Sequence, residues 1–347
     1  MKKILSILLV CMFVLAPVFA ISASAAVPFD KMIGLYNMEN DFKDSVSGKE
    51  GTLKNGASFT KDAARGNVLS LNNDSVISPG TGLGYDKEGQ FAILADSHIP
   101  NTDAMTISLW YYAKEQRNWA RVIDFGDDRA NKESADPQRF INISPANAAT
   151  GGYTIGTVNV NDGASIGFSV PNNRDRVFAP LAPTKEWVHV VLVIDPKGAK
   201  ENILYVNGVP HKSTSGGGAT DAPNPSTFSP KDILSAVTGV GPTYLGRSRY
   251  NTNGDQVFNG FVDDVAIFNV ALTADQVKEL STTDLSKGDP TKAAATTTAA
   301  AAATTTKAPA GGTTTAPKTG DATLFIVLTM ITAIAGSAVV VRARASK

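Results

Sequence analysis

Between residues 27 and 281 the chain repeatedly alternates apolar and polar residues, and this period of two restricts its fold more than any other feature. Successive side chains of a β-strand point to opposite faces of a sheet, so the alternation is typical of strands with one buried face. The segments with strand character are 105–111, 121–125, 153–160, 165–170, 188–194, 203–206 and 258–268. Turn signals separate them, and the pair Asn207-Gly208 favours a tight hairpin.

Only one segment predicts a helix, Ala274 to Leu280. Thr273 can cap its first turn, and Gln276 stands three residues later, as in a capping box. Strands do not alternate with helices, and no repeat of about 20–50 residues is visible, which disfavours βαβ folds, propellers and solenoids. We therefore expect residues 27–281 to form one all-β domain, a two-sheet antiparallel β-sandwich of the jelly-roll type.

The N-terminus has the pattern of a secretory signal peptide. Lys2 and Lys3 precede an apolar run, and small residues follow it at 23–25, so we expect residues 1–26 to be removed. The single cysteine, Cys11, lies inside this segment. The exported chain would then have neither disulfides nor thiolate metal sites.

The C-terminal part changes composition twice. Residues 282–315 are rich in Thr and Ala and have almost no large apolar residue, which predicts a disordered stalk, because too little apolar area can be buried to offset chain entropy. The uncharged run 322–341 is long enough for one transmembrane helix. The basic residues within 342–347 should stay on the cytoplasmic side, so the domain would face outward.

The charge of the exported part excludes some partners. Without residues 1–26 and 321–347, 27 basic and 31 acidic residues remain, a net charge of about −4. A mildly acidic chain without basic blocks argues against binding to nucleic acid and against docking to anionic membrane surfaces. Contact with a membrane is expected only through the C-terminal helix.

Several segments, taken in order, resemble the laminin G-like, concanavalin A-like jelly rolls of bacterial surface proteins. They are Gly34–Glu39, Ala104–Trp110, Val122–Gly126, Glu186–Val190, Leu204–Gly208, Tyr244–Arg247 and Gly260–Phe268. The resemblance covers about residues 30–281. It implies two antiparallel sheets, one of them concave, and the binding of extracellular glycans or proteins far more often than catalysis.

The end of the chain resembles a Gram-positive cell-wall sorting signal. Pro317, Lys318, Thr319 and Gly320 precede the apolar span and the short basic tail, although Ala316 stands where that family has leucine. In the family a sortase cleaves between Thr and Gly and joins the Thr carboxylate to wall peptidoglycan. The resemblance implies a protein on the extracellular face, attached to the wall through Thr319 of the signal at residues 316–347. A plain membrane anchor is the alternative.

No catalytic group stands out. Glycoside hydrolysis needs two carboxyl groups on either side of one bond, and the glucanases of this fold carry Glu-x-Asp-x-x-Glu on one strand, which this chain lacks. Glu133 and Asp136 have another spacing and lie in a charged loop. We therefore expect a non-enzymatic, adhesin-like binding protein. The alternatives are a glycoside hydrolase on the same fold and a structural surface-assembly module with a large apolar patch.

The aromatic residues give candidate ligand contacts. Trp119 follows a polar loop and is the first candidate for stacking on a sugar ring. Tyr250 and its neighbour Arg249, in a second polar loop, are the next. Trp110 and Trp187 fall inside expected strands, so we expect both in the core.

The resemblance also implies a structural Ca²⁺ between N-terminal acids and the last strand. Glu39, Asp41, Asp44 and Asp263 are the candidate ligands, since oxygen atoms are what Ca²⁺ prefers. Asp263 would share a strand face with the core residues Val265 and Ile267, and a bare carboxylate is costly to bury. A hydrogen bond to backbone at the end of the sheet is the alternative to a cation.

Overall fold

The computed structural model describes residues 26–39, 41–76, 89–127, 139–147, 152–160, 174–198, 201–212, 228–236, 239–249 and 255–286. All of them belong to residues 1–299, one of the two compact units of the chain. The signal peptide, the Ser165–Val170 strand, Glu133, Asp136, Tyr250, the sorting motif and the span 322–341 lie outside the described residues. Within the described part, no helix is long and apolar enough to cross a membrane.

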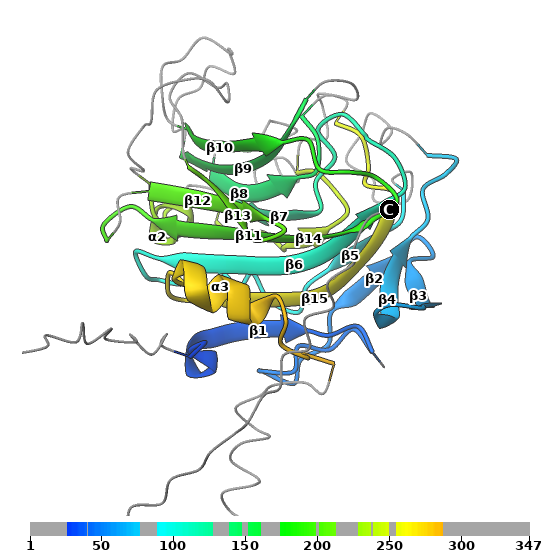
Figure 1. The fold of residues 1–347 in the computed structure, drawn as a ribbon, viewed down its shortest axis with the longest axis horizontal. Helices are drawn as coiled ribbons and strands as arrows, with labels where there is room; N and C mark the ends of the chain where they lie inside the picture. Colours follow the sequence, from blue (N-terminus) through cyan, green and yellow to red (C-terminus); the bar gives the residue numbers. More distant parts are fainter. Residues whose placement is uncertain are drawn as a thin grey trace, which may run out of the picture. The chain divides into compact units, whose positions relative to one another are not determined.

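Two antiparallel sheets make up the described part of the domain (Figure 1). The eight-stranded sheet contains β1 (Met32–Tyr36), β3 (Ser58–Asp62), β4 (Gly66–Leu71), β6 (Met105–Ala113), β11 (Trp187–Asp195), β12 (Glu201–Val206), β13 (Val209–Lys212) and β15 (Gly260–Phe268). The described strands follow the order β13-β12-β11-β6-β15-β4-β3, and β1 pairs with β15 as well. The last strand of the domain therefore lies inside this sheet.

The seven-stranded sheet contains β2 (Thr52–Lys54), β5 (Phe91–Ile93), β7 (Ile123–Gly126), β8 (Arg139–Ser144), β9 (Tyr153–Val160), β10 (Arg174–Pro180) and β14 (Tyr244–Leu245). Among the described strands the order is β10-β9-β8-β7-β14-β5-β2. The predicted all-β sandwich is confirmed, and the Asn207-Gly208 pair joins β12 to β13 as a hairpin.

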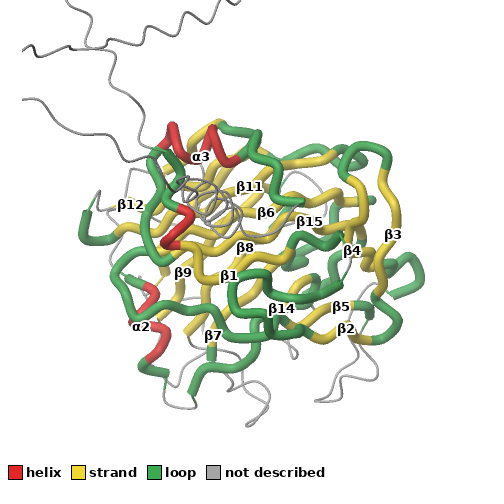
Figure 2. Tube along the Cα trace, turned by 90° about the horizontal axis from the view of Figure 1, so that it is seen from below, coloured by secondary structure: helices red, strands yellow, loops and turns green. Residues whose placement is uncertain are grey.

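The main core lies between the sheets, where one face of each strand is buried. Its largest contributions come from alternate residues of facing strands, among them Ile107, Leu109, Tyr111, Val190, Leu192, Ile123, Phe125, Ile141 and Ile143, all fully buried. A second cluster covers part of the outer face of the eight-stranded sheet. There α3 (Ala274–Leu280) contributes Val277 and Leu280, which pack with Val191, Val193 and Phe268. Figure 2 shows the resulting order of layers: α3, the eight-stranded sheet, then the seven-stranded sheet.

The helix α3 has the bounds that the sequence predicts. The Thr273 hydroxyl accepts a hydrogen bond from the Gln276 N–H at 3.3 Å, and the Gln276 carboxamide accepts one from the Thr273 N–H at 2.9 Å. The expectation of a single helix is wrong, because α2 (Pro230–Leu234) and the short 3-10 turn η1 (Phe29–Lys31) are also present. Elements this short span too few residues to show a helical period.

The prediction that Trp110 and Trp187 belong to the core is wrong. Both are half-buried on the outer face of the eight-stranded sheet, since their neighbours Tyr111 and Val188 point inward. The Trp110 ring stacks on His189 with 4.8 Å between ring centres, and His189 bonds the Ser108 hydroxyl at 2.9 Å, in keeping with a structural role. The outer face of these strands also carries large aromatic residues, so alternation alone does not show whether a tryptophan lies on the inner or the outer face.

Strict alternation along β15 also fails. The register with β6 shifts between Asp263 and Ala266, and Asp264 has a positive φ of 47°. Such a bulge adds a residue to one strand and reverses the side to which later residues point. Val265 and Ile267 therefore reach the core, whereas Asp263 lies opposite Trp110 in the ladder, with its carboxylate on Arg65. Asp263 does not share a face with these core residues, contrary to the prediction.

Candidate functional site

The outer face of the seven-stranded sheet carries a row of polar side chains. Alternate residues of β7, β8 and β9 belong to the core, which leaves Asp124, Asn142 and Thr157 pointing outward. The register places these three directly opposite one another, and Arg176 of β10 continues the row. Their exposed fractions are only 0% for Asp124, 2% for Asn142 and 4% for Thr157. Buried polar groups at this position need partners, which the neighbouring loops supply in part.

Arg249 covers Asp124 from the connection between β14 and β15. Its backbone N–H donates to one carboxylate oxygen of Asp124 at 2.9 Å, and its Nε donates to the other at 3.3 Å. Both side chains are 1% exposed. Burial raises the pKa of the Asp124 carboxyl to about 6, although the charges of Arg249 and Arg121 act in the opposite direction. The predicted ligand contact Arg249 thus lies beneath the surface as the partner of Asp124.

Trp119 lies in the connection between β6 and β7, near the same face. Its backbone has a φ of 54°, in the left-handed region that bulky residues rarely adopt. The N–H donates to the carbonyl of Ala146 at 3.1 Å. The half-buried ring lies 5.4 Å from the guanidinium carbon of Arg121 and 5.7 Å from that of Arg176. Backbone conformations of this kind are concentrated at ligand-binding and catalytic sites.

Arg121 connects Trp119 to the segment that holds Arg249. One terminal nitrogen donates to the Trp119 carbonyl at 2.7 Å and to the Ser144 hydroxyl at 2.8 Å. The other lies 3.1 Å from the carboxylate of Asp255. The arginine is 5% exposed, and its Nε has no hydrogen-bond partner. The structure thereby brings two predicted ligand residues, Trp119 and Arg249, into one connected cluster.

Four residues of this site were not predicted from the sequence: Arg121, Arg176, Asp124 and Asn142. Asp124 offered a signal, because it is a lone acid in the apolar segment 122–125. An acid there needs a cation or several donors. Arg121 lies in the β6–β7 connection, two residues after Trp119, whereas Arg176 lies on β10 and could be assigned to this site only after the strand order was known.

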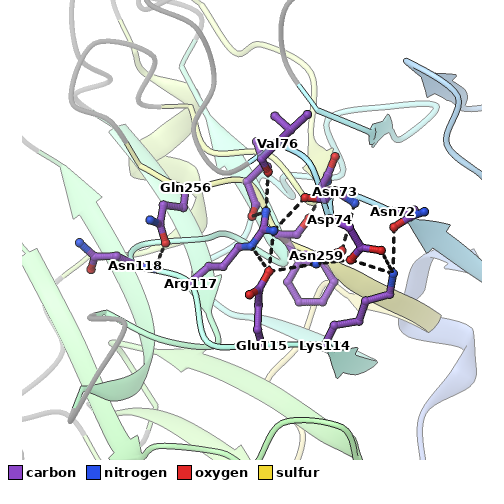
Figure 3. Close-up of polar contacts among 12 residues, drawn as sticks. Asn72, Asn73, Asp74, Val76, Lys114, Glu115, Arg117, Asn118, Gln256 and Asn259 are labelled. Carbon is purple, nitrogen blue, oxygen red and sulfur yellow. Dashed lines mark hydrogen bonds and ion pairs between the residues drawn. The ribbon is translucent and has the colours of Figure 1, made fainter.

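A polar network anchors the segment that leads to Trp119 (Figure 3). Arg117 is 5% exposed and donates to backbone carbonyls of Asn73 and Val76 at 2.8 and 2.6 Å. Asn118 and Gln256 exchange two hydrogen bonds, one of 2.6 Å to the Gln256 carboxamide and one of 3.0 Å to the Asn118 carbonyl. These contacts tie the loop to the ends of β4 and β15 on a rigid sheet, which is a common arrangement for binding loops.

The predicted calcium ligands have other partners. Asp44 is fully buried and accepts backbone N–H groups from Leu35 at 2.9 Å, Val46 at 3.0 Å and Ser47 at 3.1 Å. Asp41 accepts the N–H of Lys43 at 3.0 Å. In the part of the chain that the structure describes, no group of three or more His, Cys, Asp or Glu residues could hold a metal ion. Binding of Ca²⁺ stays a prediction.

A guanidinium lies beside Asp263 instead. Arg65 places Nε 2.6 Å from Asp263 and a terminal nitrogen 2.5 Å from Asp264, and its planar group lies 4.3 Å from the centre of the Trp110 ring. Glu39, also among the predicted ligands, is close enough for its charge to act on Asp263. Burial raises the pKa of both aspartates above the ordinary value, and Arg65 opposes this. We call Arg65, Asp263 and Asp264 the β15 ion cluster.

Comparison with known proteins adds the family. A laminin G-like family model, described as the concanavalin A-like lectin/glucanases superfamily, matches residues 86–278. The chain belongs to this superfamily. The laminin G-like resemblance drawn from the sequence is therefore confirmed. A search of curated proteins finds no match for this superfamily member.

Solved structures similar to this superfamily member include domain 4 of the extracellular arabinanase AbnA from Geobacillus stearothermophilus, in complex with arabinotriose (19% identity, 72% of this chain and 98% of that chain, TM-score 0.47). Another is the CBM40 domain of the Ruminococcus gnavus IT-sialidase, bound to alpha2,3 sialyllactose (19% identity, 52% of this chain and 83% of that chain, TM-score 0.38). A third is the Trypanosoma rangeli sialidase with 2,3-difluorosialic acid (13% identity, 74% of this chain and 34% of that chain, TM-score 0.44). The match spans about a third of the length of that sialidase.

Proposed function

We propose that the domain is a non-enzymatic module that binds an extracellular glycan on the outer face of the seven-stranded sheet, around Trp119. The observation that carries the proposal is the half-buried Trp119 ring, which lies on a left-handed backbone with the guanidinium carbons of Arg121 and Arg176 5.4 and 5.7 Å from its centre. Sugars present C–H faces that pack on aromatic rings and hydroxyl groups that exchange hydrogen bonds with amides and charged groups. The superfamily takes its description from lectins and glucanases, which supports a carbohydrate ligand.

Binding without hydrolysis fits the chemistry of this face. Hydrolysis of a glycosidic bond uses two carboxyl groups about 5–9.5 Å apart with access to the bond. The two described carboxylates of this cluster already have partners. Asp124 pairs with Arg249, and Asp255 pairs with Arg121 and accepts from the Ser248 hydroxyl. A protein ligand or a role in surface assembly would use a large exposed apolar area. Among the described residues, Val209 is the only exposed large hydrophobic side chain.

The sequence also predicts where this binding module would be displayed. Residues 316–347 would direct a sortase to cleave after Thr319 and to join its carboxylate to wall peptidoglycan. Residues 282–315 would carry the domain away from the wall as a stalk. Many copies on one surface would give avidity to a weak single site.

We expect replacement of Trp119 by alanine to weaken glycan binding several-fold, since one aromatic stacking contact contributes about 1 kcal/mol. A glycan array with residues 27–286 would identify a ligand, and calorimetry would then compare the parent with the variant. The matched control is Trp110→Phe on the opposite sheet, which should bind like the parent. Binding lost in the Trp110 variant and kept in the Trp119 variant would move the ligand to the eight-stranded sheet.

Replacement of Thr319 by alanine should shift the protein from the wall fraction to the membrane or the medium, because the residue that accepts the peptidoglycan link is gone. Fractionation of a Gram-positive host expressing the full chain measures this. Thr315→Ala, in the neighbouring stalk, is the control and should stay in the wall. If parent and Thr319 variant both remain in the detergent-soluble membrane fraction, the C-terminal segment is a plain anchor.

A further inference from the structure

Two buried hydrogen-bond donors on the proposed face have no acceptor. They are Nε of Arg121, in a side chain 5% exposed, and Nδ2 of Asn142, in a side chain 2% exposed. Most buried donors in folded proteins are paired, so an orphaned one calls for an explanation such as a missing ligand. Two such donors in one polar cluster indicate that an acceptor is expected from outside the chain.

The two donors come from neighbouring positions of the site. Arg121 donates to the hydroxyl of Ser144 at 2.8 Å. Ser144 and Asn142 are two residues apart on β8, so their side chains share a face about 7 Å apart. Asn142 is also directly opposite Asp124, whose carboxyl is influenced by the charge of Arg121. The Trp119 ring borders the same guanidinium, with 5.4 Å between the ring centre and the guanidinium carbon.

The charges decide which acceptor suits the donors. Asp255 pairs with a terminal nitrogen of Arg121, and Asp124 pairs with Arg249, so the unused donor that a ligand would meet belongs to the Arg121 guanidinium. Arg121 already uses its terminal nitrogens, so a ligand would meet its charge through Nε. A carboxylate is a better acceptor than a hydroxyl for such a donor, because charge-assisted hydrogen bonds are shorter and stronger.

We infer that the face selects acidic glycans, with the carboxylate of a uronate or sialate unit accepting from Arg121 Nε and a neighbouring oxygen of the same unit accepting from Asn142. The inference rests on the proposed function and narrows its ligand class. The sugar ring then lies on Trp119, so ring and carboxylate are recognised together. Neutral sugars can stack but leave the charged donor without its best partner.

The test compares free acids with their esters. An array would carry uronate- and sialate-terminated oligosaccharides beside the same compounds with the carboxyl group methyl-esterified, and would be probed with residues 27–286. We expect at least a tenfold stronger signal for the free acids, decreasing with added salt. Equal binding of acids and esters that still depends on Trp119 would overturn the acidic class and keep the proposed function. No glycan binding would overturn both.

Two variants test which side chains cause the preference for free acids over esters. Arg121→Lys keeps the positive charge and removes Nε, and Asn142→Asp adds a negative charge to the row. Both should reduce binding of the free acids about tenfold or more and change binding of the esters little. Lys61→Gln, at an exposed position on β3 of the other sheet, controls for general charge effects. It should change binding of neither the free acids nor the esters. Because Arg121→Lys could disturb folding, Asn142→Asp gives the second result, and unchanged acid preference in a folded Asn142 variant would contradict the inference.

Discussion

Replacement of Arg65 by alanine is expected to lower the free energy of unfolding by about 3–5 kcal/mol, the usual cost of removing one partner from a buried ion pair. The arginine is the cation of the β15 ion cluster, with contacts of 2.6 Å to Asp263 and 2.5 Å to Asp264. Their side chains are 3% and 12% exposed, so water could replace little of the lost interaction. The Trp110 ring would also lose the guanidinium packed on it.

Urea denaturation of residues 27–286 measures the change. Lys61→Ala, on β3 and exposed, is the matched control and should stay within about 0.5 kcal/mol of the parent. Removing the acids as well tests the cause. The triple variant Arg65→Met, Asp263→Asn, Asp264→Asn should recover most of the loss, because no buried charge remains unpaired. If Arg65→Ala unfolds at the same urea concentration as the parent, the cluster does not stabilise the fold.

The same cluster gives a test of the calcium prediction. In the parent the guanidinium already pairs with both acids of β15, whereas Arg65→Ala leaves Glu39, Asp263 and Asp264 without that neighbouring cation. A rise in melting temperature with Ca²⁺ in the parent would support the ion that the family resemblance implies. A rise seen only in Arg65→Ala would show that the arginine stands in for a metal.

Arg249→Ala is expected to lower the free energy of unfolding by a similar amount, about 3–5 kcal/mol, because it leaves Asp124 buried without its closest cation. Five backbone and side-chain oxygens accept from this arginine: the two carboxylate oxygens of Asp124 and the carbonyls of Asp124, Asp127 and Pro242. The backbone N–H contact survives the substitution, but every guanidinium contact is lost. Asp124→Asn with Arg249→Met should restore part of the stability, since both charges are then absent.

Thermal and urea unfolding of Arg249→Ala would be compared with Lys212→Ala, an exposed cation on β13. The result also decides between two roles for the residue. A large loss of stability supports the buried partner of Asp124 that the structure places there. An unchanged stability together with lost glycan binding would restore the ligand contact that the sequence predicts for Arg249.

The elements predicted correctly are those that depend on residues close together in the sequence. The α3 helix has its predicted bounds because Thr273 and Gln276 cap it within one turn, and β12 and β13 meet at Asn207-Gly208 because that pair fits the turn. The sandwich followed from alternation along the strands. These inferences needed only residues that are close in the chain.

The features that went wrong depend on contacts between distant residues. Arg65 and Asp263 are 198 positions apart, and nothing in either segment names the other. The bulge at Asp264 put Asp263 on the face opposite to that of Val265 and Ile267. A pattern of period two gives no sign of one extra residue in a strand. For the candidate site, Trp119 was named from its polar surroundings, but its flanking arginines come from the β6–β7 connection and from β10, which only the sheet order brings together.

The pairing of β1 with β15 has a consequence for the order of folding. The first strand adds to an edge that exists only once the last strand is in place, and β15 itself lies between β6 and β4. A chain delivered from its N-terminus therefore holds residues 32–36 without their partner until residues 260–268 emerge. Contacts of such long separation make folding slow. Until then the half-finished sheet would stay open along its centre, with β6 and β4 each lacking the strand that lies between them.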